Sequence, residues 1–138
     1  MLKAKYGADY LPPSAVGMFK DVPADNWAAR WVEQAAREGI IPACNVSLKL
    51  FCPTSPVTRD HMAVFLLKAK YGASYKPPQP VGVFTDVSVN NWAAAWIEKL
   101  AADGVTYGCT TTPRKYCPTM TVTRDQMSIF LVKNFNLP

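Results

Sequence analysis

The pattern of apolar and polar positions over residues 27–38 has the period of an amphipathic helix. Its apolar face consists of Trp27, Trp31, Val32 and Ala35, and its polar face of Arg30, Glu33 and Arg37. Asp25 and Asn26 are of the types preferred at a helix N-cap, and Gly39 can adopt the backbone conformation that ends a helix. We therefore predict a helix over residues 27–38. The same pattern precedes Gly104 and carries Trp92, Trp96, Ile97 and Leu100.

A second type of helix is predicted to begin at Thr58, because threonine is a favoured N-cap residue. Val57 and Met62 flank this start and can form a hydrophobic staple. The buried face that follows consists of Met62, Phe65, Leu66 and Ala69, and Gly72 ends the helix. The equivalent start at Thr123 has Gln126 three residues later, which predicts a capping box.

Both helix types occur twice because the chain repeats itself at a spacing of 65 residues, without insertion or deletion. Residues 1–65 and 66–130 share 33 identical positions. Among them, Phe19, Asp21, Trp27, Trp31, Gly39, Cys44, Cys52 and Arg59 return as Phe84, Asp86, Trp92, Trp96, Gly104, Cys109, Cys117 and Arg124. A tandem unit buries its core largely by packing on its neighbours. The predicted fold is therefore all-α: tandem helical-hairpin repeats in a helical bundle, with short loops and little or no sheet.

Proline-rich spacers separate the predicted units and are expected to be extended and semi-rigid. Both spacers keep a tyrosine, Tyr10 and Tyr75, which predicts packing against the helices. The expected parts are the end of a preceding repeat plus spacer (1–18), a repeat (19–71), a spacer (72–83) and a repeat with the C-terminal end (84–138). Because Met1 aligns with Leu66, in the middle of a predicted helix, we expect the chain to be a piece of a longer array.

The net charge of +5 does not by itself indicate a nucleic-acid-binding protein, since the chain has no long basic run and no recognition motif. Four lysines, Lys3, Lys5, Lys68 and Lys70, are expected at equivalent helix C-termini, where cations offset the helix dipole. A basic patch for phosphate or an acidic glycan is the alternative. No apolar run approaches the roughly 18 residues that cross a bilayer, so we predict no membrane span.

Four cysteines form two equivalent pairs, Cys44 with Cys52 and Cys109 with Cys117. Because each pair is duplicated with its unit, we expect a disulfide within each unit. Such bonds would place the protein in an oxidising compartment, secreted or at the cell surface. A metal site is one alternative, but structural zinc is usually bound by four ligands and His61 is the only histidine. Reduced thiols are the other.

The order of these features resembles the S-layer homology repeat. It runs from Phe-x-Asp-Val through a tryptophan-bearing helix and a loop closing on an aromatic-x-Pro to Val-Thr-Arg and a second helix. The resemblance covers residues 19–71 and 84–135, and the loop cysteines resemble a variant found in secreted bacterial proteins. It implies a helical bundle that binds anionic cell-wall polysaccharide and anchors an exported protein. In this family the helix often begins Thr-Arg-Ala-Glu, whereas here Asp60-His61 and Asp125-Gln126 replace Ala-Glu.

The resemblance and the residue types together give the candidate glycan-binding residues Arg59, Arg124, Trp27, Trp92, Asp21 and Asp86. The arginines match the family motif and could offer a bidentate fork to a carboxylate. The two tryptophans could stack on a sugar ring, although tryptophan at helical spacing is more often part of a core. The two aspartates could reach a ligand or calcium, although capping of the following turn is the simpler interpretation.

Two functional hypotheses follow. The first is an anchoring module that binds cell-wall polysaccharide. The second is a structural protein whose repeats stack with other copies of itself, as a homo-oligomer, surface layer or filament. We predict no enzyme, because no nucleophile with its base and no pair of catalytic carboxylates recurs in the two copies. Neither a cofactor nor a metal is expected.

Overall fold

The computed structural model describes residues 1–138. The helices are α1 (Leu2–Tyr6), α2 (Ala29–Arg37), α3 (Arg59–Tyr71), α4 (Ala94–Ala102) and α5 (Arg124–Phe135). The strands are β1 (Thr110–Thr111) and β2 (Arg114–Lys115). We call residues 19–71 the first unit and residues 84–138 the second unit.

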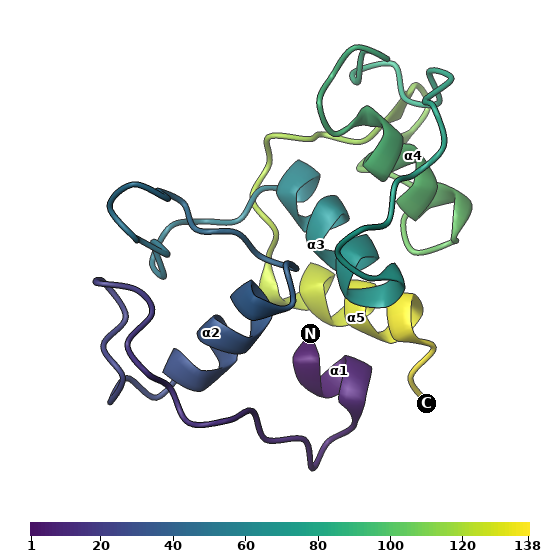
Figure 1. The fold of residues 1–138 in the computed structure, drawn as a ribbon. Coiled ribbons are helices and arrows are strands. Elements are labelled where there is room, and N and C mark those ends of the chain that lie inside the picture. Colours follow the sequence, from purple (N-terminus) through teal and green to yellow (C-terminus); the bar gives the residue numbers. More distant parts are fainter.

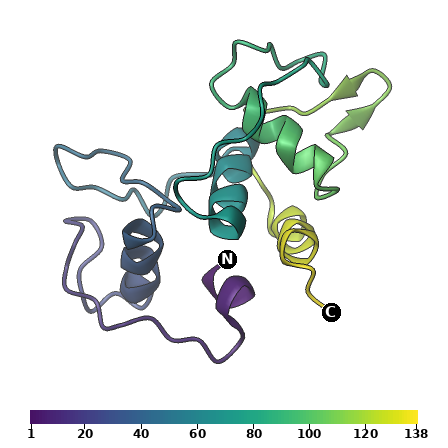
Figure 2. The same cartoon turned by 45° about the vertical axis from the view of Figure 1, so that its right-hand side comes forward.

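The prediction of an all-α repeat bundle is wrong, because the structure is a small mixed domain of five helices and a two-stranded sheet. The strands are antiparallel and pair Thr110 with Lys115 and Thr111 with Arg114. They lie in the loop closed by the second cysteine pair, and Figure 2 shows them as a hairpin beside α4. Threonine has a β-branched side chain that favours extended backbone. The corresponding loop of the first unit, which lacks the three consecutive threonines, has only a single bridge between Asn45 and Leu50.

Three equivalent helices form the centre of the molecule, since α1, α3 and α5 all contact one another. Figure 1 shows α3 and α5 side by side, with α1 below α5. α4 packs on α3, and the largest apolar cluster joins α3, α4 and α5. It includes the fully buried Leu66, Leu67, Ile97 and Leu100. Two smaller clusters surround Leu2 with Ile40 and Phe19 with Val22.

The first predicted helix is shorter than expected, because α2 begins at Ala29 and Trp27 lies before it. Trp27 is 87% exposed, so its predicted place on the buried face is wrong. Asn26 accepts a hydrogen bond from the Ala28 amide through Oδ1 (2.9 Å) and so forms a turn before the helix rather than its N-cap. Gly39 follows the helix with φ = 65°, as its predicted role at the helix end requires.

Thr58 and Thr123 stand at the N-caps of α3 and α5, as predicted. Their hydroxyls, however, bond to the carboxylates of Asp60 and Asp125 and not to backbone amides. The predicted capping box with Gln126 is therefore absent. Each threonine hydroxyl donates to the aspartate two residues later, so it does not accept the backbone amide that a capping box requires.

Each spacer is held to the helices by an aromatic side chain, as predicted. Tyr10 meets Trp31 edge to face, with ring centroids 6.2 Å apart, and Tyr75 meets Trp96 in the same way at 6.1 Å.

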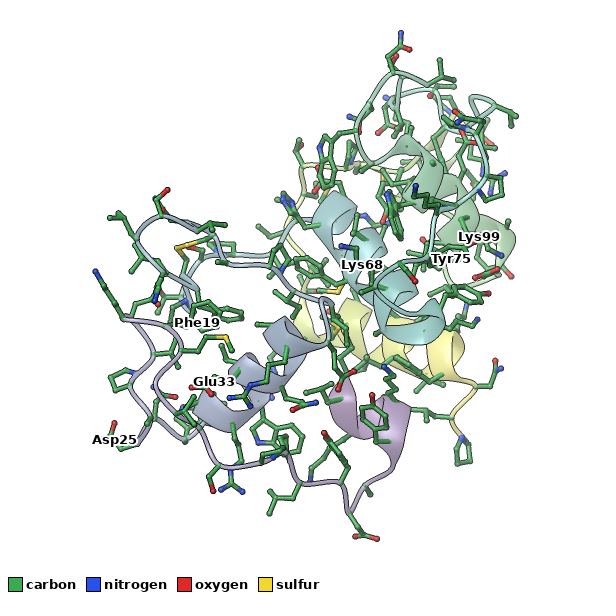
Figure 3. The ribbon with its side chains drawn as sticks, in the orientation of Figure 1. Phe19, Asp25, Glu33, Lys68, Tyr75 and Lys99 are labelled. Atoms are coloured by element: carbon green, nitrogen blue, oxygen red, sulfur yellow. A yellow bond between two sulfur atoms is a disulfide. The ribbon has the colours of Figure 1, made fainter.

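The prediction that Glu33 lies on the exposed polar face of α2 is wrong, because this residue is only 1% exposed. Its carboxylate accepts the backbone N–H groups of residues 16–18 (2.8–3.1 Å), and Figure 3 shows its place on α2.

Candidate ligand-binding site

The start of α3 docks on the cysteine loop of the second unit. The backbone N–H groups of Arg59 and Asp60 donate to the carbonyls of Met120 (2.9 Å) and Pro118 (3.0 Å). The Val122 N–H donates in return to the Val57 carbonyl at 2.9 Å. These bonds satisfy amides that a helix start leaves without an intrahelical partner. They also place the Arg59 side chain between the two units.

Arg59 is 4% exposed and is held by two aromatic residues. Its Nε donates to the Tyr116 carbonyl at 2.9 Å, and the Tyr116 hydroxyl donates to the Arg59 carbonyl at 2.8 Å. The guanidinium lies 4.7 Å from the ring centroid of Tyr116 and 5.6 Å from that of Phe130. Burial raises the pKa of Tyr116, so its hydroxyl stays protonated and remains a donor over the physiological range.

The charge of Arg59 has no counter-anion, since none of the ion pairs in the structure includes it. The neighbouring Asp60 carboxylate is occupied by the Thr58 hydroxyl and by the backbone and ring of His61. Nη2 of Arg59 is buried and has no hydrogen-bond partner. A buried cation without a counter-anion is costly, so an anion that bound beside Arg59 would be stabilised by its charge.

Arg59 lines a cavity of about 380 Å³, which we call the junction pocket. The side chains that we use below are Arg59, Tyr107, Gln126 and Lys133. Tyr107 is 66% exposed, and the ammonium group of Lys133 lies 4.9 Å from its ring centroid. Gln126 has a buried Oε1 without a partner. The pocket thus combines two cations, an exposed aromatic ring and a buried acceptor that has no hydrogen-bond partner.

Asp21 and Asp86, predicted to contact glycan or cap a turn, each bind a cysteine loop. Asp86 accepts the backbone N–H groups of Tyr116 (2.8 Å) and Cys117 (2.7 Å). Asp21 accepts those of Phe51 (2.8 Å) and Cys52 (2.7 Å). The Phe51 amide is the main reason why the pKa of Asp21 lies below its ordinary value. Both carboxylates therefore position a loop, and a role in glycan binding stays a prediction.

The remaining candidate residues lie outside the junction pocket. Arg124 is exposed at the start of α5, and no hydrogen bond or ion pair holds its side chain. Trp27 stands alone before α2, whereas Trp92 is 57% exposed and packs on His61 with ring centroids 4.9 Å apart. Arg59 is therefore the only one of these candidate residues that lines the junction pocket.

Both predicted disulfides are present, Cys44–Cys52 and Cys109–Cys117, and no cysteine is free. Asp86 lies near the second bond, and its carboxylate and the two sulfur atoms are within 4.8 Å of one another. Because these sulfurs are bonded to each other, they are not thiolates that could hold a metal. The longest helix has 13 residues, and no helix has the length and apolar character required to cross a membrane.

Sequence reasoning missed Tyr107, Tyr116 and Lys133. Lys133 continues a series with Lys3 and Lys68 at the same repeat position, and that series was a usable signal. Tyr107 corresponds to Pro42 and had no such signal.

Models of known protein families give no match to this chain, and no curated protein matches it. The resemblance to S-layer homology repeats therefore remains a prediction.

Proposed function

We propose that the protein is an extracellular binding module that attaches to an anionic cell-wall polysaccharide through the junction pocket. The observation that carries the proposal is Arg59, a buried guanidinium that lines this pocket, has no counter-anion and has an Nη2 without a hydrogen-bond partner. A carboxylate on a sugar would supply the missing charge and accept from Nη2. The disulfides favour an oxidising location for the protein.

The other lining residues suit the rest of a sugar ring. Tyr107 offers an exposed aromatic face against which a ring can stack, and Gln126 Oε1 can accept from a hydroxyl. Lys133 adds a second positive charge at the rim. A volume of about 380 Å³ lies within the range of small-molecule sites, which is roughly 300–1,000 Å³. One site per chain follows, because Arg124 faces solvent.

Binding of a purified wall polysaccharide that carries carboxylates tests this proposal, with the same polysaccharide after chemical reduction of its carboxylates as the ligand control. Arg59→Met removes the charge and keeps much of the volume, and it should weaken binding at least about tenfold, or roughly 1.4 kcal/mol. Lys133→Ala and Tyr107→Ala change exposed side chains and should weaken binding without affecting folding. Arg124→Met is the matched control and should bind like the unaltered protein.

The stability of the Arg59 variant separates a binding role from a structural one. Arg59→Met removes a buried charge that has no counter-anion, which favours folding, and loses the hydrogen bond from Nε to the Tyr116 carbonyl, which opposes it. The free energy of unfolding should therefore change by less than about 2 kcal/mol. If Arg59→Met, Lys133→Ala and Tyr107→Ala all bind normally, or if reduced polysaccharide binds as well as the acidic form, the proposal is wrong.

A further inference from the structure

The first unit has a groove of about 730 Å³, which we call the first-unit groove. It occupies the same place in its unit as the junction pocket does in the second unit. At the spacing of 65 residues, its lining residues Cys44, Ser55, His61 and Phe65 correspond to Cys109, Met120, Gln126 and Phe130 of the junction pocket. The volume of the first-unit groove is nearly twice that of the junction pocket. A segment that fills part of the junction pocket therefore has no counterpart in the first-unit groove.

The start of α3 is what narrows the pocket. Its backbone amides bond to the Pro118 and Met120 carbonyls, and the Arg59 side chain bonds to the Tyr116 carbonyl and stacks on that ring. The equivalent carbonyls of the first unit belong to Phe51, Pro53 and Ser55. None of these three carbonyls accepts a hydrogen bond in the structure.

The first-unit groove is also unsuited to the ligand of the junction pocket. Its walls are mainly apolar and include Ile41, Met62, Phe65, Met127 and Leu131. No lysine or arginine lines it. An apolar groove bordered by free carbonyls fits a helix start, which offers apolar side chains and free amides together.

The start of α5 has the features that such a groove would bind, namely exposed side chains and unbonded amides. Arg124 is exposed, and no carbonyl of another segment accepts the N–H groups of Arg124 and Asp125. In α3, by contrast, both equivalent amides are bonded to the second unit. The molecule therefore carries a groove and a helix start that are complementary to each other, and both are free.

We propose that the first-unit groove is an interaction surface for the start of a helix from a further unit of the same type. The incoming segment would have a threonine N-cap, an arginine next to it and a methionine four residues after that cap. Its first amides would donate to the Pro53 and Ser55 carbonyls, and its arginine would lie over Phe51. This interaction is independent of polysaccharide binding, since it uses none of the cations of the junction pocket.

A tethered helix start tests the proposal without the entropy cost of binding a free peptide. The nine residues from Val57 to Phe65 are copied directly before Met1, because Met1 aligns with Leu66. The added segment should fill the groove, extend α1 and raise the midpoint of thermal unfolding by at least about 4 °C, with a matching gain of helical circular dichroism. The control extension carries aspartate at the positions copied from Arg59 and Met62 and should give no gain.

A substitution in the groove locates the effect. Ser55→Arg adds a bulky cation at the exposed groove edge and should remove the gain, whereas Ser14→Arg, at an exposed serine outside the groove, should keep it. A stabilisation that survives Ser55→Arg, or that the control extension gives equally, contradicts docking in this groove. No stabilisation by the native extension also contradicts it.

Discussion

At the residue scale, single polar side chains hold backbone segments that have no regular structure of their own. Glu33 accepts three successive amides of one spacer, and Glu98 accepts the amides of residues 81–83 of the other. Burial alone would raise the pKa of Glu33. The amides of Met18, Val16 and Gly17 and the charge of Arg37 outweigh that effect and hold the pKa below its ordinary value of 4.5.

Glu33→Gln should destabilise the protein by about 2 kcal/mol, because an amide NH₂ would face backbone donors that now meet a carboxylate. The glutamine variant at the more exposed Glu98 should cost less. Chemical denaturation at pH 7 measures both, and equal small losses would contradict the role given to Glu33.

The same residue makes a prediction about pH. Because the pKa of Glu33 is lower in the folded than in the unfolded protein, its contribution is complete above about pH 4.5 and is lost as the pH falls below that value. Unfolding free energies measured from pH 7 to pH 3 should therefore fall less steeply in Glu33→Gln than in the unaltered protein. Parallel pH profiles would show that Glu33 does not carry this dependence.

At the element scale, two helices with nearly the same starting sequence have different surroundings. α3 and α5 both begin with threonine, arginine and aspartate. The first amides of α3 bond to the Pro118 and Met120 carbonyls, whereas the start of α5 faces solvent. Sequence does not separate them, because the difference comes from which unit lies beside each helix.

Amide hydrogen exchange should detect this difference. The amides of Arg59 and Asp60 should exchange at least about a hundredfold more slowly than those of Arg124 and Asp125, because only the first pair is bonded across a unit boundary. The equivalent sequences make each pair the control for the other. Similar exchange rates at the two helix starts would contradict the docking of α3 on the second unit.

At the scale of the whole molecule, the disulfides brace loops that connect separate parts. Cys109 lines the junction pocket, and Cys117 follows Tyr116, whose carbonyl and ring hold Arg59. The second disulfide thus supports two sides of the pocket. The first, Cys44–Cys52, borders only the first-unit groove.

Replacing either cysteine pair by serine should lower the free energy of unfolding by about 2.5 kcal/mol, from the entropy of a nine-residue loop. Only the variant of Cys109 and Cys117 should also weaken polysaccharide binding, and the variant of Cys44 and Cys52 is its matched control. Unfolding and binding measured on both variants check this. An equal loss of binding in the two would show that the pocket does not depend on its own disulfide.

The sequence by itself determined the repeat, the ends of α3, both cysteine pairs and the packing of the spacer tyrosines. These features depend on local spacing or on exact duplication, and both can be read along the chain. It did not determine the hairpin at Thr110–Lys115, the burial of Glu33 or the exposure of Trp27. Helical periodicity predicted that Glu33 faces solvent, because periodicity within one helix carries no information about the spacer that packs over this residue.

Only the tertiary structure distinguished Arg59 from Arg124, since the two are equivalent in sequence. One is buried between units and the other is exposed, because the start of α3 bonds to the cysteine loop of the second unit whereas the start of α5 bonds to no other segment of the structure. The candidate site follows from that difference. A repeated motif specifies the same side chain twice, but its chemistry is set by the neighbours that only the folded chain brings to it.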